Sequence, residues 1–370
     1  MSMDEIAAHI VSPPPSPHGA AKLDRPRALL AVASLLCASL LPVGPVLADA
    51  LRSATPNADT ASADRLLGVD ASAYHALLEG RTEQATSLLR ATLAANPADA
   101  TAHQLLCRVY YAQDDADDAI QQCELAVADA QPAASEQASD SELWLGRAYG
   151  MKARHAGPIL GFTLARKVEA SFARAVQLGP ANVAALNDLG EYYVAAPFVI
   201  GGGDERARAL AANMMPRFPG AAHRLLARIA VSDNNLPTAE SEFKQAIAAD
   251  RSPEAWIDLA QFYQTHARPD DAVAAVKSAL ALDRNHGPAL VDAASILTAA
   301  NRDPGLAIRC LRDYLSSHAL SDAAPAFKVH LQLSRLLAAS GDATGAASEV
   351  AAAAALAPDF TQTARSAQGL

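Results

Sequence analysis

The sequence is poor in aromatic residues, which make up 5% of its 370 positions, although 51% of the positions are hydrophobic. Strands favour aromatic and β-branched side chains, so this shortage argues against a β-rich protein. Alanine dominates the hydrophobic fraction, and it is the residue that stabilises helices best. The composition therefore predicts an all-α protein with a large core.

Positive charge is also scarce. The chain has 30 basic and 40 acidic residues, for a formal net charge of −10. Proteins that bind nucleic acids usually carry a basic face or stripe. We therefore expect no nucleic-acid partner.

Apolar runs in the sequence are short, and the one near the N-terminus has the features of an export signal. Lys22, Arg25 and Arg27 precede ALLAVASLLCASLLPVGPVLADA at residues 28–50. Its apolar core of about 14 residues is shorter than the roughly 20 that span a bilayer. We expect residues 1–50 to be a secretory signal peptide with a long n-region, followed by a linker at 51–63. The protein would then be periplasmic or secreted. The alternative is an uncleaved anchor in the inner membrane, which would make the protein a subunit of an envelope assembly or secretion system and is the one case in which we expect membrane contact.

Cysteines are few. Removal of the signal would leave Cys107, Cys123 and Cys310, and an odd number excludes a disulfide scaffold. His103 lies one helical turn before Cys107, so three interpretations stay open: simple packing, a Cys107–Cys123 disulfide, or a thiol-active site. The spacing lacks the C-x-x-C pattern and fourth ligand of a zinc site, so no metal is expected.

The sequence is rich in internal repeats. Trp256-x-x-Leu259-Ala260-x-x-Tyr263 is followed by Ala272-x-x-x-Val276-x-x-Ala279, and similar frames return elsewhere. The other copies begin near residues 102, 141, 186 and 330. Prolines at 97, 180, 219 and 358 come where a unit ends, because proline cannot continue a helix.

This pattern resembles the tetratricopeptide repeat, a helix–turn–helix unit of 34 residues with the pattern W-x-x-L-G-x-x-Y. The resemblance implies a right-handed α-solenoid of about eight repeats. We expect it to cover residues 64–360 and to be followed by a flexible tail at 361–370. It also implies that the first helix of each repeat lines a concave face, and that the protein is an adaptor holding a partner protein or peptide rather than an enzyme.

Two neighbouring repeats are longer than the others, with insertions near 152–163 and 196–205. Tyr193 and Ala207 are five residues farther apart than Tyr263 and Ala272 in the regular unit. The insertions carry apolar segments beside glycines, and because they leave the same edge of adjacent repeats they should touch. They either form a small apolar cluster or present a loop patch to a partner. The patch consists of Ile159, Leu160, Phe162, Phe198, Val199 and Ile200.

The second insertion contains three consecutive glycines in APFVIGGGDERA, which could suggest a phosphate-binding loop. Such loops follow a buried strand and contain Gly-Lys-Ser/Thr, and both features are missing from the sequence here. We instead interpret the glycines as the end of one helix, with Asp204 and Glu205 beginning the next.

The expected concave face carries arginines although the chain is acidic. On each first helix a small residue such as Gly146, Gly190 or Ala260 lets the facing helix approach, and larger residues such as Phe172 fill the seam between helices. The candidate groove residues lie one position after this small residue, or one turn before that position. They are Arg108, Arg147, Asn187, Glu191, Arg224, Arg228, Gln261 and Arg335. Guanidinium groups bind carboxylates in bidentate geometry. The groove would therefore hold an acidic or extended segment of a partner, unless the arginines pair with acidic residues of neighbouring repeats.

No catalytic motif or cofactor loop occurs in the sequence, so we expect a non-enzymatic scaffold without a cofactor. An enzyme-accessory or thiol-active protein, resting on His103, Cys107 and Cys123, is the remaining alternative. The sequence does not identify the partner.

Overall fold

The computed structural model describes residues 69–130 and 136–360, and these residues form helices without any strand. The expected signal peptide at 1–50, the linker at 51–63 and the tail at 361–370 lie outside the described residues. Within the described residues the first eight α-helices are α4 (Val69–Leu78), α5 (Thr82–Ala95), α6 (Ala100–Ala112), α7 (Ala116–Asp129), α8 (Glu136–Ala153), α9 (Pro158–Leu178), α10 (Val183–Ala195) and α11 (Asp204–Met214). The other eight are α12 (Pro219–Ser232), α13 (Leu236–Asp250), α14 (Pro253–Thr265), α15 (Pro269–Leu282), α16 (Ala289–Ala299), α17 (Pro304–Leu315), α18 (Ala326–Ala339) and α19 (Ala343–Leu356). A 3₁₀ turn, η3 (Phe198–Ile200), lies between α10 and α11.

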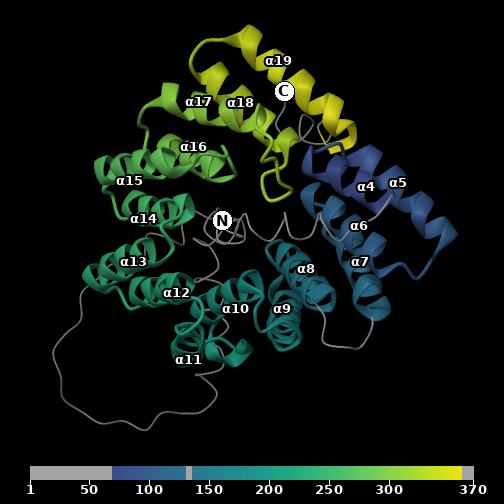
Figure 1. The fold of residues 1–370 in the computed structure, drawn as a ribbon, viewed down its shortest axis with the longest axis horizontal. Helices are drawn as coiled ribbons and strands as arrows, with labels where there is room; N and C mark the ends of the chain where they lie inside the picture. Colours follow the sequence, from purple (N-terminus) through teal and green to yellow (C-terminus); the bar gives the residue numbers. More distant parts are fainter. Residues whose placement is uncertain (1–68, 131–135, 361–370) are drawn as a thin grey trace, which may run out of the picture. The chain divides into compact units, whose positions relative to one another are not determined.

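The α-helices of the described residues pack as eight successive hairpins, from α4–α5 to α18–α19 (Figure 1). The first helices of neighbouring hairpins also contact one another, as α6 does α8 and α12 does α14. They therefore form a continuous row, which we call the inner row. This is the α-solenoid of helical repeats, and the number of repeats, that the sequence predicts.

Local sequence explains where the helices begin. Asp99, Asn182 and Ser252 each accept a hydrogen bond from a backbone N–H three residues on, which satisfies a donor that the helix itself leaves open. Proline occupies the first turn of six helices, where its missing N–H costs nothing. These helices are α9, α12, α13, α14, α15 and α17.

The small residues of the repeat frame are required by close packing between helices. A Cβ atom on Gly146 in α8 would lie 2.5 Å from the ring of Phe172 in α9. One on Gly190 in α10 would lie 2.8 Å from Leu225 in α12. Large residues fill these positions from the facing helix, and this is why the small–large alternation could be read as a helix-pair repeat.

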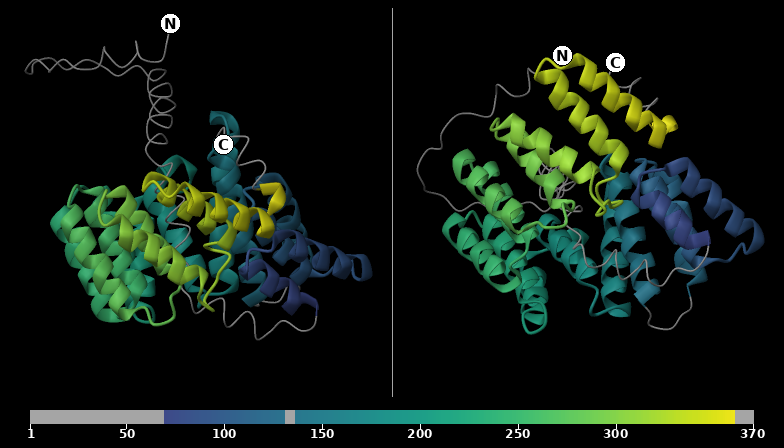
Figure 2. Two further views of the ribbon diagram at one scale, coloured as in Figure 1. Left: turned by 90° about the horizontal axis from the view of Figure 1, so that it is seen from above. Right: turned by 45° about the horizontal axis from the view of Figure 1, so that its top comes forward.

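The first and last repeats contact each other. Phe327 of α18 is fully buried in the same apolar cluster as Tyr74 and Leu77 of α4. Lys328 Nζ lies 2.7 Å from Asp114 Oδ1, across 214 residues of sequence. Figures 1 and 2 accordingly show α18 and α19 beside α4 and α5. The repeat frame did not predict this contact.

The first long insertion is helical rather than a glycine-hinged loop. The segment from Pro158 to Phe162, expected to be a loop, forms the first turns of α9, and the linker from α8 is short. Proline at the first helical position is preorganised for a helix, and Gly161 stays within it. The extra residues thus lengthen α8 and α9 to 18 and 21 residues.

The second insertion is a compact turn that needs its glycines. Gly201 and Gly203 have positive φ angles of 96° and 123°, which residues with a side chain rarely adopt. A Cβ on Gly202 would lie 1.8 Å from the carbonyl oxygen of Ala196. The amides of all three glycines donate to backbone carbonyls of this turn or of the last turn of α10, at 2.7 to 3.2 Å. They are therefore already used within the turn, which argues against a phosphate loop.

Candidate interaction surfaces

The arginines expected to line a groove form ion pairs between neighbouring repeats. Each pair joins two helices of the inner row, or α6 to the segment before α18. The pairs are Arg108–Asp322 and Arg147–Asp188, both 2.7 Å, Arg224–Asp258 at 2.6 Å and Arg228–Glu191 at 3.0 Å. The structure thus pairs these arginines with acidic residues of neighbouring repeats, which is the alternative to partner binding that the sequence left open.

Arg147 and Asp188 form a buried, bidentate pair. Arg147 Nε donates to Asp188 Oδ2 at 2.7 Å and Nη2 donates to Oδ1 at 3.4 Å. Both side chains are 5% exposed. Burial raises the pKa of the Asp188 carboxyl, and the Arg147 guanidinium opposes that rise. The Arg147 side chain also lies over the Trp144 ring, 4.7 Å from its centroid, which adds a cation–π contact.

Arg108 joins the first repeats to the last. Its guanidinium lies 5.1 Å from the Tyr74 ring centroid and 5.0 Å from that of Trp144. Nε donates to Asp322 in the segment before α18. Arg108 therefore belongs to the contact between the two ends of the repeat array rather than to an open groove.

One stretch of the inner row keeps unused hydrogen-bond donors. Glu191 of α10 binds Arg228 of α12, which also lies 3.6 Å from Asp258 of α14. Buried donors in this stretch bond to no described residue: Asn187 Nδ2, Arg224 Nε and Nη1, and Arg228 Nε. The Arg224–Asp258 contact is thus an ion pair without hydrogen-bond alignment. We call the set Asn187, Glu191, Arg224, Arg228 and Asp258 the inner polar cluster.

Glu191 gives this cluster a group that titrates near neutral pH. Burial raises the pKa of Glu191 to about 7, and the carboxylates of Asp188 and Asp258 add to the rise, while Arg228 opposes it. A partner that brings a positive or hydrogen-bond-donating group would favour the ionised form. One that brings a carboxylate would favour the protonated form.

The remaining groove candidates lie elsewhere. Gln261 of α14 donates to Gln264 on its own helix at 3.2 Å, and Arg335 is exposed on α18. The acidic partners of the arginines were not predicted from the sequence. A signal was present, because Asp188 and Asp258 both stand two residues before the small residue of their first helix.

Cys107 and Cys123 are joined by a disulfide between α6 and α7, with Cα atoms 5.3 Å apart. His103 does not complete a thiol site, because its ring nitrogens contact Gln122 Oε1 at 2.8 Å and the Pro97 carbonyl at 3.0 Å. Cys310 is a buried free thiol, and burial raises its pKa to about 11. A reactive thiol needs a lowered pKa, so neither environment favours thiol chemistry.

The apolar residues of the two insertions come together at α9 and η3, which contact each other. Ile159, Phe162 and Phe198 are 88%, 42% and 84% exposed. Leu160 and Val199 are also exposed. Ile200, expected in the same patch, is instead buried at 8% because its backbone holds the turn against α10.

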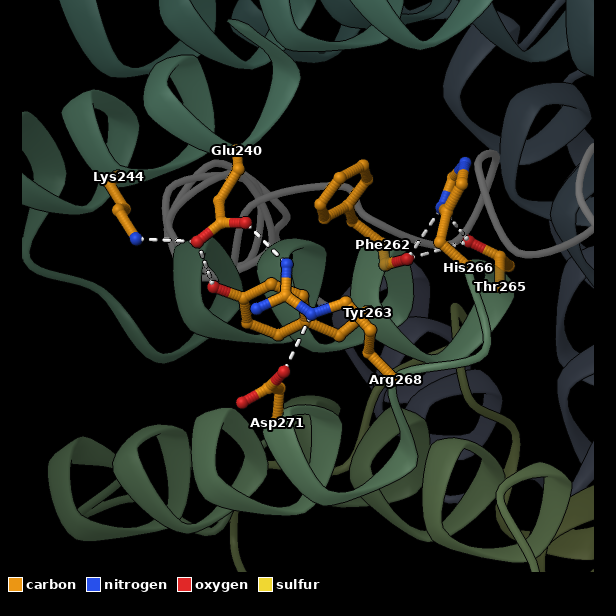
Figure 3. Close-up of polar contacts among 8 residues, drawn as sticks. All are labelled: Glu240, Lys244, Phe262, Tyr263, Thr265, His266, Arg268 and Asp271. Atoms are coloured by element: carbon orange, nitrogen blue, oxygen red, sulfur yellow. Dashed lines mark hydrogen bonds and ion pairs between the residues drawn. The ribbon is translucent and has the colours of Figure 1, made fainter. Parts of the chain in front are cut away.

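A polar cluster ties α13, α14 and the start of α15 together (Figure 3). The Glu240 carboxylate accepts from Lys244 Nζ at 2.6 Å, from Tyr263 Oη at 2.9 Å and from Arg268. Arg268 also donates to Asp271 and stacks 4.2 Å from the Tyr263 ring centroid. The hydrogen bond from Lys244, with those from Arg268 and Tyr263, lowers the pKa of Glu240 to about 2, against the opposing effect of burial.

Replacing Glu240 by glutamine should lower the free energy of unfolding by about 1–2 kcal/mol at pH 7, since charge-assisted hydrogen bonds are lost. A carboxyl whose folded pKa is depressed stabilises the fold above its unfolded pKa, near 4.5, and loses this contribution as pH falls towards 2. The difference between the variant and wild type should therefore shrink below pH 4.5. Urea denaturation at pH 7 and pH 4 measures it. Glu205→Gln, at an exposed helix start, is the control; an equal effect of both substitutions would contradict the prediction.

Within residues 69–130 and 136–360, no three His, Cys, Asp or Glu side chains are grouped so as to hold a metal ion. In the same residues no helix combines the length and hydropathy needed to cross a membrane.

Comparison of the sequence with known protein families agrees with the helix-pair repeats seen in the structure. Residues 76–139, from α4 to the start of α8, match the tetratricopeptide repeat family model. The protein carries tetratricopeptide repeats. The comparison with curated proteins gives no match.

Several solved structures are similar to this tetratricopeptide repeat chain. A thermophilic tetratricopeptide repeat protein of Thermus thermophilus is 22% identical with a TM-score of 0.39, covering 59% of this chain and 92% of its own. Yeast Tom70 is 16% identical with a TM-score of 0.49, covering 83% of this chain and 63% of its own. A tetratricopeptide repeat protein of Parabacteroides merdae is 12% identical with a TM-score of 0.35, covering 67% and 89%. At such identities and TM-scores these matches carry no argument about function.

Tetratricopeptide repeats are protein–protein interaction modules, and the fold is typically non-catalytic. The chain is in this general sense a scaffold for protein binding. Its particular surfaces are the inner polar cluster and the exposed apolar residues at α9 and η3.

Proposed function

We propose that this protein is an exported scaffold that binds an extended segment of a partner protein on its inner row of helices. The observation that carries the proposal is a set of donors in the inner polar cluster that bond to no described residue: Asn187 Nδ2, Arg224 Nη1 and Arg228 Nε. Arg224 Nε is left out of this set because it faces Asp258 Oδ2 at 2.6 Å. A buried donor without an acceptor costs about 1–3 kcal/mol. Such a cost is tolerated at binding sites, where a ligand supplies the missing acceptor.

The chemistry of these donors defines the partner segment. Amide and guanidinium N–H groups bind carbonyl and carboxylate oxygens, which an extended peptide presents along its backbone and at acidic side chains. The donors come from two successive first helices, α10 and α12, so they are distributed along the inner row as the acceptors of an extended chain are. The Glu191 and Asp258 carboxylates balance the arginines, which favours hydrogen bonding to neutral carbonyls with only a few carboxylates.

Two features support export. The segment at residues 28–50 has the pattern of a secretory signal. The Cys107–Cys123 disulfide is of the kind that persists in oxidising compartments. The partner would then be a protein of the cell envelope or the exterior.

Asn187→Ala tests the proposed function. Because Asn187 Nδ2 bonds to no described residue, its loss should leave the free energy of unfolding unchanged within about 0.5 kcal/mol or raise it. Capture of the partner from an envelope extract should fall at least tenfold, an effect of about 1.4 kcal/mol. The measurement is affinity capture with quantitative mass spectrometry, beside urea denaturation of the same samples.

Asn213→Ala is the matched control, since Asn213 is exposed on α11, a second helix outside the inner row. It should capture the same proteins as wild type. The proposal fails if Asn187→Ala and Asn213→Ala retain the same proteins in equal amounts. A loss of stability in Asn187→Ala would instead assign a structural role to this side chain.

A further inference from the structure

Exposed apolar side chains are concentrated at one place on the molecule. Seven large hydrophobic residues are exposed among those the structure describes, and five of them lie on the first turns of α9 or on η3. We call these five the apolar tip: Ile159, Leu160, Phe162, Phe198 and Val199. The other two, Leu125 and Leu282, are single exposed side chains of the kind found on most proteins.

The two parts of the apolar tip are held in place together. The Tyr192 hydroxyl of α10 lies 2.8 Å from the Ala165 carbonyl of α9 and 2.7 Å from the Ile200 carbonyl of η3. Arg206 of α11 binds Glu169 of α9 at 3.0 Å and also donates to the Gly201 carbonyl. These bonds hold α9 and η3, the two elements that carry the tip, against each other before any partner arrives.

Two side chains of the apolar tip project outward: Ile159 and Phe198 leave 88% and 84% of their surfaces accessible. Leu160, Phe162 and Val199 surround them as a half-covered base. A protein partner would have to supply a pocket for each of these side chains. A lipid bilayer accepts projecting aliphatic and aromatic side chains without a matching shape, and their burial there is favourable.

The segment that carries the α9 part of the tip is basic, although the chain carries a net charge of −10. The segment 152–167, which spans the end of α8 and the start of α9, has four Lys and Arg residues, one His and no acidic residue. Arg154 and Arg166 are exposed and form no ion pair with a described residue, while Lys152 and Lys167 pair with acidic side chains of α7. Beside η3, Glu169 is paired with Arg206, and Asp204 and Glu205 begin α11.

We propose that the apolar tip inserts into the interfacial region of an anionic lipid bilayer, with Arg154 and Arg166 contacting lipid phosphates. Projecting apolar side chains ringed by basic ones are the combination that binds reversibly to a membrane surface without crossing it. The tip lies on α9 and η3, whereas the inner polar cluster lies on the inner row. The scaffold could thus hold its partner while resting on the membrane.

Vesicle binding by the full chain tests the proposal. Flotation is measured with vesicles of phosphatidylcholine alone and of phosphatidylcholine mixed with phosphatidylglycerol. The wild-type chain should bind the anionic vesicles at least tenfold more strongly than the neutral ones, and high salt should weaken this binding. Ile159→Ser/Phe198→Ser should reduce binding to anionic vesicles about tenfold or more. Arg154→Glu/Arg166→Glu should remove the preference for anionic lipid.

Leu125→Ser/Leu282→Ser is the matched control, because it removes the two exposed leucines outside the tip and should bind as wild type does. Residues 28–50 are present in every sample, so any lipid affinity of their own is common to all. Phe198→Trp gives an independent readout that leaves the tip apolar: its fluorescence emission should shift to shorter wavelength on adding anionic vesicles.

The proposal is overturned if Ile159→Ser/Phe198→Ser binds vesicles as strongly as wild type, or if the Phe198→Trp emission does not respond to them. Analytical ultracentrifugation of the same variants addresses a second copy of the chain as the occupant. If serine substitution abolishes self-association while vesicle binding is unchanged, the tip is an interface between copies and the proposal is wrong.

Discussion

Replacing Asp188 by alanine is expected to lower the free energy of unfolding by about 3–5 kcal/mol, because it leaves the Arg147 guanidinium buried without its counter-charge. Arg147 is 4% exposed, and among the described residues Asp188 supplies its only hydrogen bonds and its only ion pair. The pair joins α8 to α10, so the interface between two neighbouring repeats should weaken first. Urea denaturation followed by circular dichroism measures the loss. The fluorescence of Trp144, over which Arg147 lies, reports on this interface locally.

The double substitution Arg147→Leu/Asp188→Leu separates the cost of an unpaired charge from the value of the pair. Removing both charges should cost clearly less than Asp188→Ala, since a buried ion pair contributes little net stability compared with apolar residues of similar size. Asp117→Ala is the control, because Asp117 pairs with Lys152 between α7 and α8 but is 76% exposed, so its loss should stay within about 0.5 kcal/mol. Equal losses of stability in Asp117→Ala and Asp188→Ala would show that burial of an ion pair does not determine how strongly its removal destabilises the fold.

Phe327→Ala is expected to cost about 3–5 kcal/mol, the usual range for removing a fully buried phenylalanine. Its location predicts an additional result. Phe327 shares an apolar cluster with Tyr74 and Leu77, although about 250 residues separate them in the sequence. Amide hydrogen exchange should therefore lose protection in α4 and α5 as well as in α18, where the substitution stands.

Phe172→Ala provides the comparison, because Phe172 is equally well buried, at 3%, between α8 and α9 in the interior of the array. Phe172→Ala should lower the free energy of unfolding by a similar amount. The amides of α4 and α5 should nevertheless stay better protected from exchange than they are in Phe327→Ala. Retained protection of α4 and α5 in Phe327→Ala would mean that the contact between the first and last repeats contributes nothing to their stability.

The repeat architecture could be predicted because its determinants are local. Gly146 and Gly190 stand where the facing helix brings a large side chain, and helix caps such as Asn182 and Ser252 mark where helices begin. Each of these features recurs at a fixed spacing, so the sequence alone indicates helices, pairs and their number. The glycine turn at residues 201–203 was likewise identified as a helix boundary.

Other features depend on contacts that a repeat frame does not contain. The loop expected at Pro158 is helical because its composition satisfies a helix start as well as a loop, and the length of the insertion does not distinguish the two. The groove arginines could be located, but their pairing depends on which residue the next helix presents, and that was the alternative the sequence left open. Asp322 could not be assigned to Arg108, because 214 residues separate them and neither belongs to the other's repeat.

The contact between the first and last repeats changes how the array should fold. In an open array of repeats each unit is stabilised only by its neighbours, the two outermost units have one neighbour each, and unfolding can begin by fraying there. Here the residues around Arg108 and Phe327 give both outermost units a second neighbour. Unfolding then has to break two interfaces to release any unit, which raises the cooperativity of the transition. During synthesis the N-terminal repeats acquire their full stability only after the last repeat has left the ribosome.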